Sequence, residues 1–205
     1  MENQDAIARL RQALAEYAEG ERENTILDAR EEEAKAPVRE RALKLLNQRA
    51  RSREELRTRL RDLDFPTGVI EEVLDDLEGV GLINDRHFAE QWVRQRHERR
   101  GKSARMLDRE LIAKGVASDI REDALSQITR EDEESIAWAI LEKKARRITS
   151  IPRDSAEYDK HLRRLLGMLA RRGFPQGMSM ALAHRCLDER LEELRQSTGG
   201  EDGEG

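Results

Sequence analysis

The sequence has one cysteine, few aromatic residues and no long apolar run, and these absences exclude several classes of protein. Cys186 has no second cysteine, so the chain can form neither an internal disulfide nor a thiolate-rich zinc site. No apolar run approaches the length of a membrane span, and the first residues lack the basic and apolar parts of a secretion signal. Aromatic residues make up 3% of the chain and only four residues are proline, which favours helices over sheets. We therefore expect a soluble, cytoplasmic, helical protein that does not enter a membrane.

The sequence also lacks a catalytic motif. No glycine-rich phosphate loop ends in Lys-Ser or Lys-Thr, so ATP hydrolysis is not expected. His87, His97 and His161 are scattered, and no serine or cysteine has the surroundings of a nucleophile. His184 and Cys186 stand two residues apart, and residues at that spacing do not face each other on a helix. We predict a non-enzymatic protein without cofactor or metal, in which Cys186 is buried in the core.

Charged residues make up 40% of the chain, and their sign alternates along it. Basic residues outnumber acidic ones by nine to four in 39–63, by nine to four in 86–114 and by ten to three in 143–172. Between these stretches, 64–85 has seven acids and no base, and 115–136 has seven acids against two bases. The net charge of −5 therefore hides three basic segments that could contact phosphates or acidic protein surfaces.

An internal repeat accompanies this alternation. One apolar frame of five positions occurs three times, with spacings of 51 and then 58 residues. Its members are Leu56, Leu60, Phe65, Val69 and Leu74; Leu107, Leu111, Val116, Ile120 and Leu125; and Leu165, Leu169, Phe174, Met178 and Ala183. Pro66 and Pro175 open the helix after each turn, and Gly115 and Gly173 end the helix before it. Each copy therefore predicts a tight helix-turn-helix.

A further helix is predicted before each of these pairs. Its apolar face recurs at helical spacing in all three copies. The face residues are Ala42, Leu45, Leu46 and Arg49; Ala89, Trp92, Val93 and Arg96; and Ala137, Ile140, Leu141 and Lys144. Ser52 and Glu55 have the spacing of a capping box for the second helix of the first copy, and Ser103 has the equivalent place in the second. Each copy thus predicts three helices.

The predicted fold is all-α, with three tandem three-helix, helix-turn-helix-like repeats in an elongated, curved array. The expected layout is an acidic, partly helical N-terminal extension, three repeats and a disordered acidic tail. The extension spans 1–36, the three repeats span 37–83, 84–130 and 131–195, and the tail spans 196–205. An exposed loop is expected at 148–157, inserted in the third repeat. Within the extension, Ile7, Leu10, Leu14 and Tyr17 have the spacing of a short amphipathic helix.

The densest basic cluster surrounds Gly101. It consists of Arg94, Arg96, Arg99, Arg100, Lys102, Arg105 and Arg109. Such a cluster suits phosphate oxygens or an acidic protein groove, and the alternative is a solvated face paired with Asp108 or Glu110. The last helix of the first two repeats is acidic, so any nucleic acid would meet the first two helices. We expect Trp92 in the core and not as an exposed stacking platform.

The central part of the chain resembles the RecX family. The family pattern is an Asn-Asp-x-x-Phe-Ala helix, a basic turn with glycine, and a helix that ends in Glu-Leu-x-x-Lys-Gly-Ile/Val. Here these elements are Asn84, Asp85, Phe88 and Ala89, then Gly101, then Glu110, Leu111, Lys114, Gly115 and Val116. Ala42, Leu45 and Leu46 with Ser52 and Leu56 are similar to the family's first repeat. The resemblance spans about residues 38–190.

This resemblance implies a regulator of the RecA recombinase that binds the RecA filament, with single- or double-stranded DNA within or beside it, and restrains its activity. We expect a monomer. The charge clusters and the resemblance together give eleven candidate contacts: Arg49, Arg51, Arg53, Arg94, Arg96, Arg99, Arg100, Lys102, Arg105, Arg109 and Lys114. Two alternatives remain, a sequence-independent DNA-binding protein that competes with the recombinase for DNA, and a helical scaffold that binds only protein.

Overall fold

The computed structural model describes residues 11–12 and 29–199 of the chain. Within these residues all regular structure is helical, which confirms the all-α prediction. The predicted helix marked by Ile7, Leu10, Leu14 and Tyr17 lies outside them, apart from the helical pair at 11–12. Contacts divide the chain into two units: the first ends at Ala89 and also contains Leu111–Arg121, and the second contains Glu90–Glu110 and the chain from Glu122.

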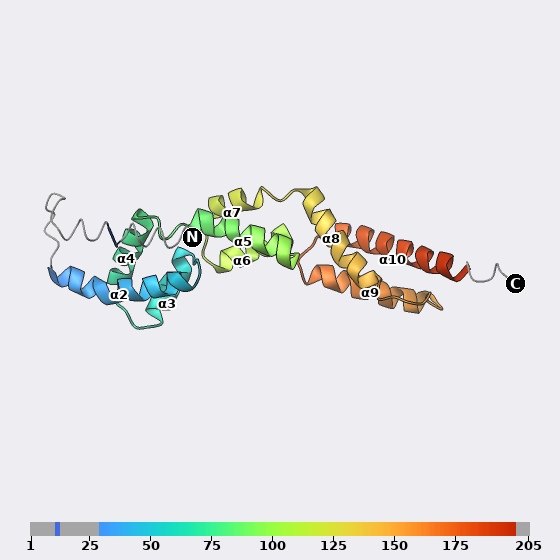
Figure 1. Ribbon diagram of the computed structural model, residues 1–205, viewed down its shortest axis with the longest axis horizontal. Helices are drawn as coiled ribbons and strands as arrows, with labels where there is room; N and C mark the ends of the chain where they lie inside the picture. The colour runs from blue at the N-terminus through green and yellow to red at the C-terminus, as the bar shows by residue number, and fades with distance from the viewer. Residues whose placement is uncertain (1–10, 13–28, 200–205) are drawn as a thin grey trace. The chain divides into compact units, whose positions relative to one another are not determined.

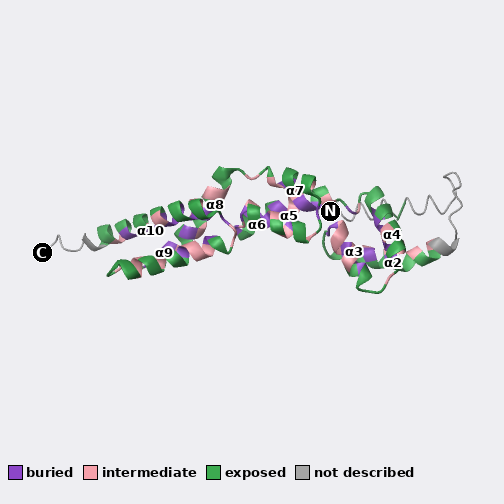
Figure 2. Cartoon of the chain, turned by 180° about the vertical axis from the view of Figure 1, so that it is seen from behind, coloured by how far each residue is buried: buried purple, intermediate pink, exposed green. Residues whose placement is uncertain are grey.

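Three helices of the first unit pack pairwise around one apolar core (Figure 1). They are α2 (Ala29–Gln48), α3 (Arg53–Arg61) and α4 (Thr67–Gly79). Figure 2 shows buried residues along each of these helices, and their spacing places them on one face of the helix. They include the predicted Ala42, Leu45, Leu46, Leu56, Leu60 and Leu74, and Phe65 and Val69 pack partly buried against them. The apolar frame of the first repeat therefore marks its core.

Helix α2 begins at Ala29, upstream of the predicted start of the first repeat at residue 37. Two ion pairs join its early turns to α4: Lys35 Nζ lies 2.8 Å from the Glu72 carboxylate, and Arg39 Nη2 lies 3.2 Å from that of Asp76. Part of the predicted extension is therefore helix that belongs to the first unit. At its other end α2 stops before Arg49, which the prediction wrongly placed on the face of this helix.

Three helices of the second unit also pack pairwise around a core (Figure 1). They are α8 (Arg130–Ala145), α9 (Ser155–Ala170) and α10 (Gln176–Gly199). The core contains the predicted Leu165, Leu169, Phe174 and Ala183, together with Cys186. The prediction of a buried Cys186 is confirmed, and burial raises the pKa of its thiol to about 11.

Two predicted boundaries of the third repeat are wrong. The inserted loop was expected at 148–157, but Ser155 already begins α9, because the Asp154 carboxylate caps it by accepting the Glu157 N–H at 2.8 Å. Ile148, expected to be exposed, is buried in the core. The tail was expected from residue 196, but α10 continues through Gly199.

The middle helices are α5 (Asp85–Arg100), α6 (Ala104–Ala113) and α7 (Ser118–Leu125), and each belongs in part to both units. Their frame residues Leu107, Leu111 and Val116 are buried as predicted. In α7, Ala124 is buried and the predicted frame residue Leu125 is half-buried.

In the first unit, the N-terminus of α3 packs against the C-terminal turn of α6. The Ser52 hydroxyl donates to the backbone oxygen of Lys114 at 2.6 Å. Gly115, just after α6, has φ of +70°, and a Cβ there would collide with the Glu54 side chain. Glycine at this position therefore permits both the left-handed backbone and the close approach of α3.

The second unit repeats this junction between α6 and α9. The Ser103 N–H donates to the backbone oxygen of Arg172 at 3.0 Å. Gly173 has φ of +83°, and a Cβ there would lie 2.7 Å from Ser103 Oγ and 2.9 Å from Met106 Cβ. In both junctions the electropositive start of one helix meets the electronegative end of another, an arrangement that helix dipoles favour.

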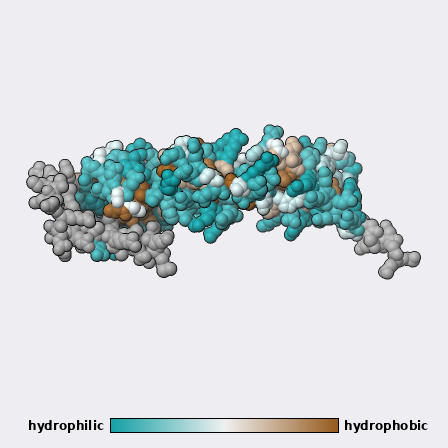
Figure 3. Space-filling view, turned by 90° about the horizontal axis from the view of Figure 1, so that it is seen from above, coloured by the Kyte–Doolittle hydropathy of each residue, from teal (hydrophilic) through white to brown (hydrophobic). Residues whose placement is uncertain are grey.

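The surface in Figure 3 is mostly hydrophilic, with apolar side chains confined to small areas. None of the helices in the described ranges combines the length and the apolar character that a bilayer span requires.

Candidate functional site

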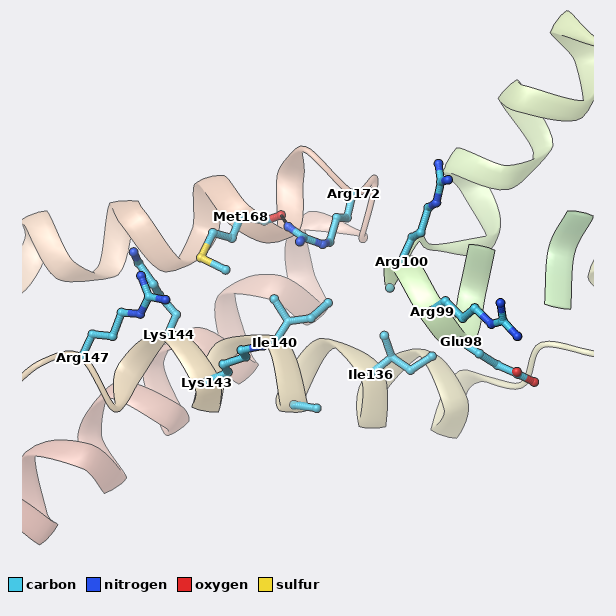
Figure 4. A pocket seen from close by; sticks show the side chains of 12 residues that line it. Glu98, Arg99, Arg100, Ile136, Ile140, Lys143, Lys144, Arg147, Met168 and Arg172 are labelled. Atoms are coloured by element: carbon cyan, nitrogen blue, oxygen red, sulfur yellow. Dashed lines mark hydrogen bonds between the residues drawn. The ribbon is translucent and has the colours of Figure 1, made fainter. Parts of the chain in front are cut away.

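A groove of about 530 Å³ lies in the second unit, bounded by the end of α5, one face of α8 and part of α9 (Figure 4). Apolar side chains form part of its surface, and basic side chains surround them. The lining residues are Glu98, Arg99, Arg100, Gly101, Ile136, Ala139, Ile140, Lys143, Lys144, Arg147, Met168 and Arg172.

Helix α8 contributes one continuous face to this groove. Ile136, Ile140 and Lys143 are spaced four and three residues apart, so they lie in a row along the helix, and Arg147 follows in the turn just after it. Ile136 and Ile140 are half-buried and also pack against the core of the unit, which fixes this face of α8. Met168 joins them from α9.

Gly101 brings the end of α5 to the groove. It has φ of +57°, a left-handed conformation that glycine adopts without strain. A Cβ at this position would lie 2.7 Å from Cδ1 of Ile140, so any other residue would require the end of this side chain or the turn to shift. The close approach places Arg99 and Arg100 at the groove.

The basic side chains of the groove are not neutralised. Arg99, Arg100, Lys143, Lys144 and Arg147 have no carboxylate partner in the part of the chain that the structure describes. Arg172 Nη1 donates to the backbone oxygen of Met168 at 3.2 Å, and among the described lining residues Glu98 is the only acid. Clustered, unneutralised cations produce a positive potential that attracts an anionic partner.

Two other candidates from the cluster around Gly101 are paired. Arg96 Nε lies 3.1 Å from the Glu110 carboxylate, and Lys102 Nζ also pairs with Glu110. The Arg96 guanidinium covers the Trp92 ring at 3.2 Å from its centroid, and Trp92 Nε1 donates to Glu110 at 3.0 Å. Trp92 is half-buried, so the prediction that it lies in the core is wrong, but Arg96 covers it.

Three candidates from the same cluster do not line the groove. Arg94, Arg105 and Arg109 are exposed side chains of α5 and α6. Arg94 donates to the side-chain oxygen of Gln91 at 2.6 Å. The structure therefore brings only Arg99 and Arg100 of the predicted contacts to the groove.

Three more candidates surround Glu55 in the first unit. The Glu55 carboxylate lies 3.1 Å from Arg49 Nη1, 2.9 Å from Arg51 Nη1 and 3.2 Å from Lys114 Nζ. The Ser52 side chain accepts the Glu55 N–H at 3.2 Å, as the predicted capping box requires, but the carboxylate points to these cations. Burial alone raises the pKa of Glu55, but its contacts with Arg49 and Lys114 outweigh burial and lower it.

Arg51 is the most enclosed of these cations, with 7% of its surface exposed. Its Nε donates to the backbone oxygen of Leu45 at 3.1 Å, and its Nη2 donates to Gln48 at 3.2 Å. Burial, and then the charge of Arg49, lower its pKa. A partner cannot reach this side chain in this conformation, so we leave Arg51 out of the proposed contact surface.

Arg53 is engaged by three carboxylates of α4. Its guanidinium lies 2.6 Å from Glu78, 3.0 Å from Glu71 and 2.6 Å from Asp75. Burial alone lowers the pKa of Arg53, but its hydrogen bonds to Asp75, Glu71 and Glu78 outweigh burial and raise it. The acidic helix α4 therefore neutralises Arg53.

The motif residues have structural positions. Asn84 caps α5 by accepting the His87 N–H at 2.9 Å. Asp85 accepts the N–H of Arg53 at the start of α3 at 2.8 Å, and burial raises the pKa of Asp85. Phe88, Ala89 and Leu111 are buried, and Gly101 and Gly115 have left-handed backbones.

The predicted contacts did not include the other four basic residues of the groove: Lys143, Lys144, Arg147 and Arg172. Their signal was the excess of ten basic over three acidic residues in 143–172. That count did not show which of the ten side chains lie together. The packing of α8 against α9 decides this, and the sequence does not show how two helices pack.

The chain matches two family models. Residues 39–77 match the first three-helix domain of RecX, and residues 84–125 match its second three-helix domain.

Relatives match over most of the chain. Regulatory protein RecX of Corynebacterium efficiens is 57% identical over 199 residues, which cover 95% of each chain. Regulatory protein RecX of Streptomyces coelicolor is 42% identical over 151 residues, which cover 74% of this chain and 78% of that protein. The crystal structure of RecX from Lactobacillus salivarius matches with a TM-score of 0.64 and 28% identity, over 76% of this chain and 97% of that one.

Proposed function

Since this chain belongs to the RecX family, we propose that it is a regulatory, non-enzymatic protein that binds the RecA-DNA filament. It restrains the ATPase and strand-exchange activities of the recombinase in DNA repair and the SOS response, and it acts as a monomer. The relatives named Regulatory protein RecX support the regulatory role. The observation that carries the proposal is the groove, where five cations without a described carboxylate partner gather in a chain of net charge −5.

The first test compares three partners at physiological salt: RecA assembled on single-stranded DNA with a slowly hydrolysed nucleotide, the same DNA alone, and RecA alone. Fluorescence anisotropy of the labelled chain reports each affinity. We expect clear preference for the filament. Equal or tighter binding to naked DNA, with a steep salt dependence, would favour the competitor for DNA instead.

The second test asks whether the groove makes the contact. The double variant Arg99→Glu/Arg100→Glu places acids at one end of the groove and should weaken filament binding about tenfold or more. The matched control is Arg163→Glu/Arg164→Glu, which changes the same charge at exposed positions of α9 outside the groove. Unchanged binding of the groove variant, or an equal loss in the control, would count against the groove.

A further inference from the structure

The chemistry of the groove changes along its length. From Ile136 to Lys144, α8 advances about 12 Å, and Arg147 lies in the turn just after the helix. Arg99 and Arg100 lie near the Ile136 end, and Lys143, Lys144 and Arg147 lie toward the other (Figure 4). A ligand that pairs with both groups must therefore carry negative charges separated by several ångströms, which a single phosphate ion cannot provide.

Between these two groups the groove is apolar apart from Arg172, whose Nη1 donates to the backbone oxygen of Met168. Ile136, Ile140 and Met168 are half-buried, and Figure 4 shows them between the two basic groups. Covering such side chains with apolar groups of a ligand is favourable, but a sugar-phosphate backbone offers few apolar groups. Nucleic-acid sites that hold single strands commonly provide aromatic side chains for base stacking, and none of the described lining residues is aromatic.

We propose that this groove binds an acidic protein segment, whose carboxylates pair with the two basic groups and whose aliphatic side chains cover Ile136, Ile140 and Met168. This inference deepens the proposed function and rests on it for the source of the segment, a protein component of the filament. Such a segment complements the groove in two ways: its carboxylates match the basic side chains, and its aliphatic side chains match the apolar part.

The probe is a fluorescent 16-residue peptide of glutamate and alanine that carries three leucines at helical spacing. A second peptide has glutamine at the three leucine positions and the same charge, and a 16-nucleotide oligothymidylate tests the nucleic-acid reading. Anisotropy titrations use the full chain at physiological salt. We expect the leucine peptide to bind at least about fivefold tighter than the glutamine peptide, because only its side chains cover the apolar part of the groove.

Two variants locate the contact. Met168→Gln keeps the length of a half-buried side chain and should remove most of the preference for leucine, without weakening oligothymidylate binding. Lys143→Glu/Lys144→Glu should weaken both peptides, whereas Arg163→Glu/Arg164→Glu should not. Circular dichroism of each variant confirms folding.

Three results would overturn the inference: equal affinity for the two peptides, no binding of either, or oligothymidylate binding that is tighter and depends on Lys143 and Lys144. Filament binding of the unmodified chain is measured separately. If the chain binds the filament but does not prefer the leucine peptide, the inference alone is refuted. If the chain does not bind the filament, the proposed function is refuted.

Discussion

At the scale of single residues, Glu55 is a buried carboxylate that organises three cations of the first unit. Only 9% of its side chain is exposed, and Arg51, which it pairs with, is as enclosed. Removing one partner of a buried ion pair leaves the other charge buried without compensation, which costs more than the pair itself contributes. Glu55 therefore contributes more to the stability of the fold than to a contact with a partner.

We predict that Glu55→Gln lowers the free energy of unfolding by about 2 kcal/mol at pH 7. The folded state lowers the pKa of Glu55, so its contribution is present above the unfolded value near 4.3 and is lost as pH falls through the lower folded value. The gap between the two proteins should therefore begin to narrow below about pH 4 and continue to narrow as the pH falls. Urea denaturation at pH 7 and at pH 3.5 measures it. Glu189→Gln, at an exposed position of α10, should change stability by less than about 0.5 kcal/mol, and a gap as large at pH 3.5 as at pH 7 would contradict the prediction.

Asp64 occupies the place in the first repeat that Gly115 and Gly173 occupy in the others. It has φ of 61° and is exposed, and it is the one non-glycine residue with positive φ in the described chain. Glycine adopts this conformation without a Cβ conflict. Asp64→Gly should therefore raise the free energy of unfolding by about 0.5 kcal/mol in urea denaturation. A decrease in the free energy of unfolding would show that the Asp64 side chain stabilises the fold by more than its left-handed backbone costs.

At the scale of helices, the repeated junction depends on glycine for two separable reasons, the left-handed backbone and the space for the neighbouring helix. Gly173 needs both, since a Cβ there would approach Ser103 and Met106. Gly81 has φ of +75° but nothing within 4 Å of its virtual Cβ, so it needs the backbone freedom alone.

Gly81→Ala should therefore cost about 1 kcal/mol of stability, and Gly173→Ala about 2 to 3 kcal/mol. The difference measures the packing of α6 on α9. Hydrogen exchange should show the additional loss of protection in Gly173→Ala at the start of α6, because the Ser103 N–H donates to the backbone oxygen of Arg172 across this junction. Equal losses of stability in the two variants would show that Ser103 and Met106 can move away from the new Cβ at no cost.

Sequence periodicity predicted much at this scale. The apolar frame, the capping role of Ser52 and the glycine turns before Val116 and Phe174 follow from local rules about helices, and the structure confirms them. The start of α2 did not follow, because its early turns pair with α4, which is distant in the chain. Junctions between repeats were also unpredicted, since no local pattern shows which turn a helix will meet.

At the scale of the whole molecule, charge counts located the basic segments but not the cations that are available to a partner. Of the eleven predicted contacts, Arg99 and Arg100 line the groove. Six others are paired with acids within the fold: Arg49, Arg51, Arg53, Arg96, Lys102 and Lys114. Availability depends on whether an acidic side chain from another helix reaches each cation. The sequence does not contain that information in any short window.

This difference separates two arginines that have the same charge. Arg53 is 20% exposed in its side chain and has three carboxylate partners, whereas Arg147 is exposed, lines the groove and has none in the described residues. Arg53→Ala should lower stability by about 1 kcal/mol, a modest value because solvent screens its partners, and leave filament affinity within about twofold. Arg147→Ala should leave stability within about 0.5 kcal/mol and weaken filament binding about threefold to tenfold.

Urea denaturation and anisotropy on the RecA-DNA filament, made on both variants at one salt concentration, measure the four values. Raising the salt should reduce the binding loss in Arg147→Ala, because counterions screen an exposed cation, and should have little effect on binding by Arg53→Ala. If Arg53→Ala weakens binding as much as Arg147→Ala while both remain folded, contact with the filament follows the density of basic residues in the sequence. The pairing of charges within the fold would then not be what selects the contact residues.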